Sequence, residues 1–216
     1  MLKSLRMSMD PYFILVLVPV ILTAITVHEF SHALAADRLG DPTAKFEGRL
    51  TLNPLSHLDP LGTLCLFIAH FGWGRPVPVN PRYFRHPLRD DMIVSACGPM
   101  SNLLTALVMG IALQVSAENS LIPVRSYLYD FLRLGLIINL SLCFFNLIPL
   151  YPLDGSHILR GLLPKSLIPE YEHISSYSPF ILLGLVALGP LFQVSVFSSV
   201  LGPPVYFFAR LFTNIL

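Results

Sequence analysis

The residues His28-Glu29-Phe30-Ser31-His32 close an apolar run that begins near Pro11 and contains no charge before Glu29. Two histidines four positions apart lie on one face of a helix, where they can share one metal ion. A glutamate beside the first histidine is placed to act as a general base on metal-bound water. Because the run is long and apolar enough to cross a bilayer, this chemistry is expected at membrane depth.

The composition is typical of a multi-span membrane protein. Of the 216 residues, 54% are hydrophobic and 12% charged, against about 25% charged in an average soluble protein. The mean hydropathy is +0.66. A net charge of +1 gives no basic footprint, so no nucleic-acid partner is expected. Cys65, Cys97 and Cys143 form no CxxC pair and are interpreted as small core residues.

Apolar segments predict about 4–5 transmembrane helices. The expected spans are Pro11–Ala36, Met92–Val115, Tyr127–Ile148 and Pro179–Phe197, and the tail Pro203–Leu216 is either a short return span or an interfacial helix. Lys3 and Arg6 before the first run would also suit a signal peptide, but no clear cleavage site precedes His28.

The sequence between the first two spans has a different pattern. Thr43–Asn53 alternates polar and apolar residues, which predicts a strand or a β-hairpin. Leu61–Phe71 is apolar but too short to cross a core of about 30 Å, which favours a re-entrant or interfacial segment. Gly72–Pro81 alternates prolines with valines and is expected to be extended.

These expectations define a mostly α-helical, polytopic membrane protein with a short hairpin or re-entrant segment between its first two spans. The chain is expected to form one membrane-embedded domain over residues 1–216, with a catalytic core at 11–163 and C-terminal helices at 178–216.

The distribution of basic residues predicts the orientation in the membrane. Nine of them follow the first and third spans, which places these loops and the nearby histidines at the cytoplasmic face: Arg38, Lys45, Arg49, Arg75, Arg82, Arg85, Arg89, Arg160 and Lys165. Lys3, Arg6 and Arg125 then lie on the opposite side.

A catalytic zinc usually has three protein ligands and one open position. The extended soluble motif would need glycine at position 35 and histidine at position 38, where Ala35 and Arg38 stand. Candidates for the third ligand are Asp154, the pair His57 and Asp59, and Glu47.

Asp154 has the better context of these candidates. It follows Pro149 and Pro152 in an irregular polar segment, and such backbone is tolerated at membrane depth only where it is buried or lines a wet cavity. A turn-capping role before Gly155 is the alternative. His57 and Asp59 lie in a turn-rich run where loop hydrogen bonding is the commoner role.

Metal binding is favoured over a merely buried histidine pair, because two histidines and a glutamate in a lipid-spanning helix are costly unless they face a polar interior. Asn139 lies two turns before Asn146 on the third span. It could extend a polar lining or form an interhelical hydrogen bond.

Two motifs together resemble the site-2 proteases, a family of intramembrane zinc metalloproteases. They are His28-Glu29-x-x-His32 and Asn146-x-x-Pro149-x-x-Pro152-Leu153-Asp154-Gly155. The intervening Gly48–Leu55, Pro76–Asn80 and Gly98-Pro-Met-Ser-Asn102 resemble a small bacterial-type branch without PDZ or CBS domains. The likeness runs from Pro11 to Leu163, although family members commonly carry a span before the motif helix.

The resemblance implies roles for individual residues. His28, His32 and Asp154 would bind one zinc ion per chain, Glu29 would be the catalytic acid and base, and Asn146 would polarise the scissile carbonyl or steady the oxyanion.

The expected function is an intramembrane zinc endopeptidase of a bacterial-type cell membrane, with transmembrane proteins as substrates and its site near the cytoplasmic face. An extended substrate could pair with Phe46–Leu52 or with the Pro76–Val79 segment, which could equally be a stiff loop. The alternatives are a non-proteolytic membrane zinc-binding protein that recognises transmembrane helices, and a zinc transporter. No pattern in the sequence indicates an oligomeric state.

Overall fold

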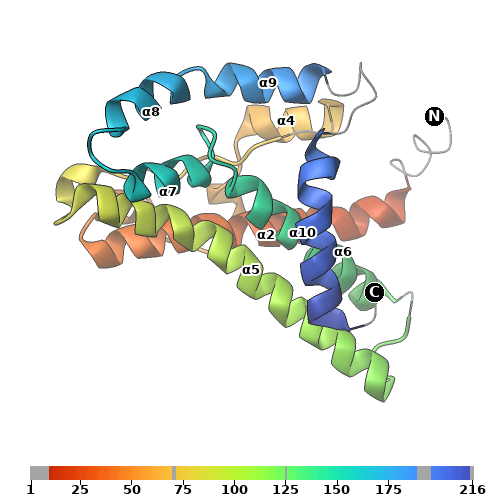
Figure 1. Ribbon diagram of the computed structural model, residues 1–216. Coiled ribbons are helices and arrows are strands. Elements are labelled where there is room, and N and C mark those ends of the chain that lie inside the picture. Colours follow the sequence, from red (N-terminus) through yellow and green to blue (C-terminus); the bar gives the residue numbers. More distant parts are fainter. Residues whose placement is uncertain (1–9, 70–71, 125, 189–195, 215–216) are drawn as a thin grey trace.

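The computed structural model describes residues 10–69, 72–124, 126–188 and 196–214, and these are mostly helical (Figure 1). The α-helices are α2 (Pro11–Leu39), α3 (Thr43–Phe46), α4 (Pro60–Ala69), α5 (Pro87–Asn119), α6 (Tyr127–Asn146), α7 (Asp154–Leu162), α8 (Ile168–Ser175), α9 (Ser178–Leu188) and α10 (Val196–Thr213). Two short 3-10 helices are also present: Pro54–Ser56 lies between α3 and α4, and Pro81–Tyr83 lies between α4 and α5.

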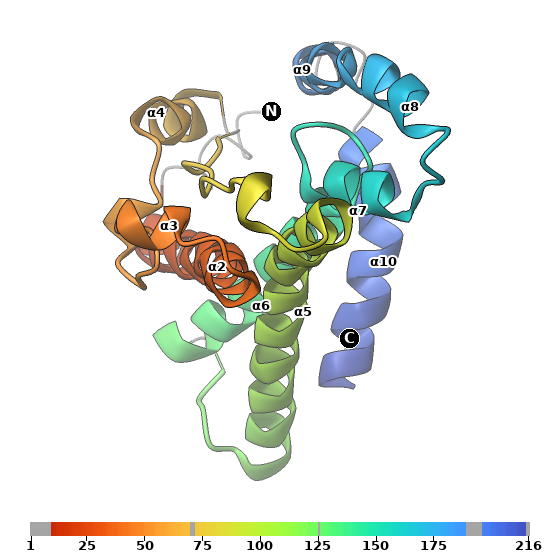
Figure 2. The ribbon, with the colours of Figure 1, turned by 90° about the vertical axis from the view of Figure 1, so that its left-hand side faces the viewer.

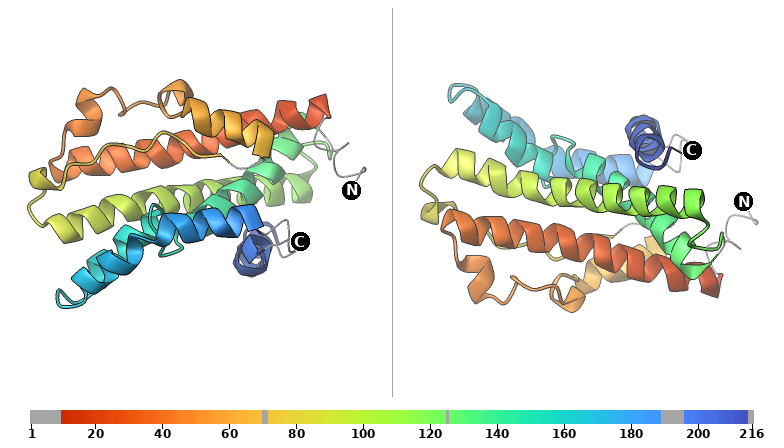
Figure 3. Two further views of the ribbon diagram at one scale, coloured as in Figure 1. Left: turned by 90° about the horizontal axis from the view of Figure 1, so that it is seen from above. Right: turned by 90° about the horizontal axis from the view of Figure 1, so that it is seen from below.

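Three helices, α2, α5 and α6, are long and apolar enough to cross a membrane. They contain 29, 33 and 20 residues, and α2 and α5 run side by side in opposite directions (Figure 3). Helix α6 packs against both. In Figure 2, α3 and α4 lie beside α2, whereas α7, α8 and α9 lie on the far side of α5. The chain is therefore an integral membrane protein with a three-helix centre.

The predicted count of four to five spans is not supported by the described residues. Helix α9 covers only the first part of the predicted span Pro179–Phe197 and has 11 residues, which rise about 17 Å and fall short of a bilayer core of about 30 Å. Residues 189–195 of that span lie outside the described ranges. The tail helix α10 begins at Val196, before Pro203, and packs against α5 and α6.

The strand or hairpin predicted at Thr43–Asn53 was wrong. Thr43–Phe46 is a helical turn, and turns and bends follow it. The fully buried Asp41 explains the difference, because its carboxylate accepts from the Thr43 amide at 3.0 Å and from the Asn80 amide at 2.6 Å. This local bonding of a side chain to the backbone outweighs the alternating pattern that predicted a strand.

The predicted re-entrant segment at Leu61–Phe71 is also not supported. Its described part belongs to α4, a single helix of 10 residues, and residues 70–71 lie outside the described ranges. The following stretch, Gly72–Asn80, forms no helix, in agreement with its prolines, and pairs with Leu58 through an isolated bridge at Gly74.

The apolar core lies between α5, α6 and α10. Its buried members are Ala106, Met109, Leu113, Leu136, Leu140, Val205 and Ala209. The opposite face of α5 is also apolar but exposed, as Leu104 and Val108 show. A helix that is apolar on its packed face and on its outer face suits a lipid environment, where exposed leucine and valine carry no solvation cost.

Two tyrosines join the beginning of α2 to the beginning of α6. The Tyr12 hydroxyl donates to Asp130 Oδ2 at 2.7 Å, and the Tyr127 hydroxyl donates to the Leu15 carbonyl at 3.4 Å. Tyrosines are enriched where transmembrane helices meet the headgroups. These contacts therefore mark one end of the bundle as a membrane boundary, and the motif histidines lie toward the other end of α2.

Candidate metal centre

The structure brings His28, His32 and Asp154 together from two separate parts of the chain. One nitrogen or oxygen from each lies within 4.8 Å of the others. His28 Nε2 is 3.2 Å from Asp154 Oδ2, His32 Nε2 is 3.3 Å from Asp154 Oδ1, and the two Nε2 atoms are 3.0 Å apart. Both histidines are buried, so this group is enclosed within the helices.

The other ring nitrogen of each histidine is bound by α5. His32 Nδ1 lies 2.8 Å from the Val94 carbonyl oxygen, which can only accept, so this nitrogen carries the hydrogen. His28 Nδ1 lies 2.6 Å from Asn102 Oδ1. The Asn102 amide nitrogen is occupied as a donor to the Ala24 carbonyl at 3.1 Å, so Oδ1 is the acceptor and His28 also donates through Nδ1.

Both Nε2 atoms therefore turn a lone pair toward the same point. Two lone pairs 3.0 Å apart, facing a carboxylate, repel one another unless a cation lies between them. Asp154 Oδ2 is buried and has no hydrogen-bond partner among the described residues. Donor atoms on a tetrahedral zinc are about 3.3 Å apart, close to the distances found here, so the three side chains fit zinc.

Asn102 is the centre of a buried amide chain that links three helices. Besides its bonds to His28 and Ala24, its Nδ2 donates to Asn139 Oδ1 at 2.9 Å. Asn139 Nδ2 in turn donates to the Gly135 carbonyl at 2.8 Å. Both asparagines are fully buried. Of the two interpretations of Asn139, the interhelical hydrogen bond is the one found.

Glycine allows α5 to approach the histidines closely. A Cβ on Gly98 would overlap His32 Nε2 and lie 2.7 Å from His28 Cε1. A similar requirement holds at Gly155, next to Asp154, where a Cβ would lie 2.5 Å from the Ile148 carbonyl oxygen. Gly98 therefore lets α5 lie close to the histidines of α2, and Gly155 lets the start of α7 pack against the backbone that follows α6.

Glu29 lies close to Gly72–Asn80, the segment that follows α4. A Cβ on Gly74 would be 3.8 Å from Glu29 Oε1. The buried Arg49 fixes this segment by donating to the carbonyls of Arg75, at 2.5 Å, and Pro76, at 3.1 Å. Burial lowers the pKa of the Arg49 guanidinium, while the nearby Glu29 charge acts in the opposite direction. The arginine thus places a positive charge in the surroundings of Glu29.

Asn146 is the last residue of α6, and its side chain does not contact the histidine–aspartate group. Its Nδ2 donates to the Leu142 carbonyl at 3.1 Å, within its own helix. The structure therefore places Asn146 at the end of α6, with its amide turned back along the helix.

The alternative ligand candidates are placed elsewhere. His57 Nε2 lies 2.8 Å from the Thr51 carbonyl oxygen, and Asp59 Oδ1 accepts from the Gly62 amide at 2.7 Å, so both have the loop roles that were the commoner expectation. Glu47 is an exposed residue at the end of α3. His157, three residues after Asp154, lies 2.9 Å from Asp91 Oδ2.

Asn102 and the Val94 carbonyl were not assigned a role from sequence. The signal for Asn102 was present in Gly98-Pro-Met-Ser-Asn102, since Gly98 and Asn102 lie one turn apart on one face. A polar side chain on an otherwise apolar span needs a buried partner. No sequence pattern could have indicated the Val94 contact, because every residue has a backbone carbonyl.

The chain is similar in sequence to known metalloproteases. The sequence model of peptidase family M50 matches residues 117–186, which include Asn146 and Asp154. The chain is 38% identical over 188 residues to "Putative zinc metalloprotease YwhC" of Bacillus subtilis, and the match covers 85% of this chain and 84% of the relative.

Two mycobacterial relatives are more distant. The chain is 32% identical over 140 residues to "Putative zinc metalloprotease Rip2" of Mycobacterium tuberculosis, covering 62% of this chain and 52% of the relative. For the protein of the same name in Mycolicibacterium smegmatis the identity is 32% over 157 residues, covering 70% of this chain and 57% of the relative. No solved structure matches the chain.

Replacing Gly98 by alanine is expected to abolish zinc binding, because the added methyl group would occupy the space of the histidine rings. The measurement is zinc content of the purified protein by elemental analysis. Gly202→Ala is the control, since a Cβ there meets nothing within 4 Å. Full zinc content in Gly98→Ala would show that the helices do not meet as closely as described.

Replacing Asn102 by alanine is expected to weaken zinc binding by about 10- to 100-fold, the usual cost of losing a group that orients a metal-binding histidine. The measurement is competition with a chelator of known affinity. Asn119→Ala on the same helix is the control, because Asn119 is exposed and bonds only to Val115. Equal affinities of the two variants would exclude an orienting role for Asn102.

Proposed function

The chain belongs to peptidase family M50, the site-2 proteases, and is a zinc metalloprotease; from this premise we propose that it is an endopeptidase that cleaves membrane proteins in or near their transmembrane segments. The observation that carries the proposal is the convergence of His28, His32 and Asp154 within apolar helices. A hydrolytic site enclosed in this way is accessible to substrates that themselves lie in the membrane.

In this proposal His28, His32 and Asp154 bind the zinc ion. Zinc bound there would polarise a peptide carbonyl and lower the pKa of a coordinated water toward about 7. Glu29 takes the proton of the attacking water on a carboxylate oxygen and later returns it to the leaving amine. Two observations support this role: Glu29 follows His28 directly in the sequence, and its carboxylate lies close to Gly74 in the segment that follows α4.

Asn146 is proposed to donate its amide hydrogens to the developing oxyanion. In the structure the amide is bound to the Leu142 carbonyl, so this role needs a side-chain rotation when substrate is present. A neutral donor suits such a position, since a second cation would cost more to bury.

The substrate is proposed to bind as an extended strand along Gly72–Asn80. Prolines remove the amide donors at positions 76 and 78, but Val77 and Val79 retain theirs, and neither amide has a hydrogen-bond partner among the described residues. Alternate amides of an extended chain point to the same side. They could therefore pair with a locally unwound substrate. Pairing along Phe46–Leu52 is not proposed, because no strand forms there.

The site is proposed to lie near the cytoplasmic face of a bacterial-type cell membrane. The connection between α2 and α5 carries five of the nine basic residues that predict this orientation, and Arg38 and Arg89 lie in the helix turns that flank it. The connection begins at the end of α2 nearest to His32. The relatives with related sequences are bacterial proteins.

Glu29→Gln is expected to retain zinc and to lower the cleavage rate by about 100-fold or more, because the amide cannot accept the water proton. A panel of purified single-span substrates, with cleavage followed by gel and mass spectrometry, provides the measurement. Glu118→Gln is the control, since Glu118 is exposed at the far end of α5. Unchanged cleavage by Glu29→Gln would refute the base, and absence of cleavage by the wild type would favour the non-proteolytic alternative.

Val77→Pro removes one amide donor from the proposed substrate strand and is expected to lower kcat/KM by about fivefold to tenfold, the value of one hydrogen bond. Val77→Thr keeps the amide and the branched side chain and is the matched control. Zinc content is measured in both variants to confirm an intact site. If the two variants cleave equally fast, the substrate does not pair with this amide.

A further inference from the structure

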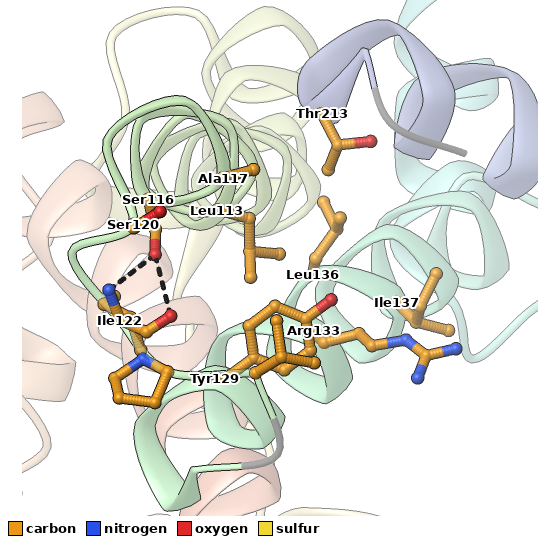
Figure 4. A pocket seen from close by; sticks show the side chains of 12 residues that line it. Leu113, Ser116, Ala117, Ser120, Ile122, Tyr129, Arg133, Leu136, Ile137 and Thr213 are labelled. Carbon is orange, nitrogen blue, oxygen red and sulfur yellow. Dashed lines mark hydrogen bonds between the residues drawn. The ribbon is translucent and has the colours of Figure 1, made fainter.

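A cavity of about 430 Å³ lies at the end of the bundle away from the metal centre. It is formed by the last turns of α5, the first turns of α6 and the end of α10. Figure 4 shows Leu113 and Ala117 on the α5 side, and Tyr129, Arg133 and Leu136 on the α6 side. The lining is mostly apolar, and Arg133 is the only charged side chain among the described residues that line it.

Arg133 forms no ion pair with a carboxylate of the described residues. All 13 acidic side chains of the sequence belong to the described residues, and none forms an ion pair with it. Asp130, one turn earlier on α6, instead accepts from the Tyr12 hydroxyl at 2.7 Å. An uncompensated guanidinium within a membrane helix is costly, so a partner from outside the chain is expected.

The cavity lies close to a membrane boundary. Tyr12 and Tyr127 mark that boundary at the starts of α2 and α6, and Arg133 is less than two turns along α6 from Tyr127. Gly98, at the metal centre, and Ser116, which lines the cavity, are 18 positions apart on α5. This corresponds to about 27 Å, nearly the thickness of the bilayer core.

We propose that this cavity is a binding site for one anionic phospholipid. The phosphodiester accepts hydrogen bonds from the Arg133 guanidinium, and the upper part of an acyl chain covers Leu113 and Leu136. The cavity is too small for the whole lipid, whose remaining chains lie in the bilayer.

The composition of the cavity selects a lipid over other anions. A free phosphate ion would lose most of its hydration to gain one cation, whereas a lipid also buries apolar surface. A guanidinium is suited to a phosphate group because its planar donors can form two parallel bonds. A lipid headgroup is also present at this membrane level at high local concentration. The site is independent of the proposed catalytic residues.

Native mass spectrometry of the purified, zinc-loaded protein tests the proposal. Dioleoyl-phosphatidylglycerol, dioleoyl-phosphatidylcholine and inorganic phosphate are added separately. The wild type is expected to bind one phosphatidylglycerol at least about tenfold more tightly than phosphatidylcholine, and to bind no phosphate. Equal binding of the two lipids, or binding of phosphate alone, would overturn the proposal.

Two variants locate the site. Arg133→Gln is expected to lose the preference for phosphatidylglycerol, and Ala117→Phe, which fills the cavity, to lose binding of that lipid. Arg89→Gln is the control, because Arg89 is exposed at the opposite end of α5. Zinc content confirms that each variant is folded, and Arg133→Met replaces Arg133→Gln if the latter loses zinc. A wild-type preference retained by the Arg133 variant and by Ala117→Phe would place the lipid elsewhere and refute this site.

Discussion

The structure depends on one constraint: every polar group inside the three-helix centre must have a polar partner, because lipid offers none. His28 and His32 meet it through α5, where Asn102 and the Val94 carbonyl accept their Nδ1 hydrogens. This arrangement fixes both tautomers and directs both Nε2 lone pairs to Asp154. The hydrogen bonds that satisfy the histidines therefore also prepare them for a metal. Stability in the membrane and readiness for catalysis have the same physical origin here.

The same constraint explains the small residues on α5. Asn102 can reach the His28 ring and the Ala24 carbonyl only because Gly98 lets the two helices approach, and Asn139 extends the chain of amides to α6. Close packing and interhelical hydrogen bonds replace the hydrophobic effect as the attraction between helices in lipid. The amide chain thus joins α2, α5 and α6 at the depth of the donor group. A change in any of these contacts alters helix packing and metal geometry together.

Sequence alone identified the features that follow from local pattern or strong polarity. The apolar runs predicted α2, α5 and α6 with their ends within a few residues. The cost of burying His28 and His32 predicted a metal site, and the resemblance to site-2 proteases assigned Asp154 as its third ligand; the three side chains lie together in the structure. Prediction from sequence failed where a tertiary contact determines the local structure. The alternation in Thr43–Asn53 predicted a strand, but the Asp41 carboxylate accepts hydrogen bonds from the Thr43 and Asn80 amides, and a helical turn forms instead. Hydropathy cannot reveal such a contact, nor the carbonyl of Val94.

The two halves of α5 have different structural roles, one in the metal centre and one in the apolar core. The half from Val94 to Asn102 carries small and polar residues and holds the histidines, whereas the half from Ala106 to Leu113 packs an apolar core with α6 and α10. Polar bonding in the first half requires fixed helix spacing, and the apolar core in the second half supplies it without competing polar groups. Arg133 is the exception to this division, because it is a cation beside the apolar half and forms no ion pair within the described ranges. Arg133 lies at the membrane boundary, where a lipid headgroup can neutralise its charge. Because it is far from the metal centre, its charge does not disturb the charges around His28, His32 and Asp154.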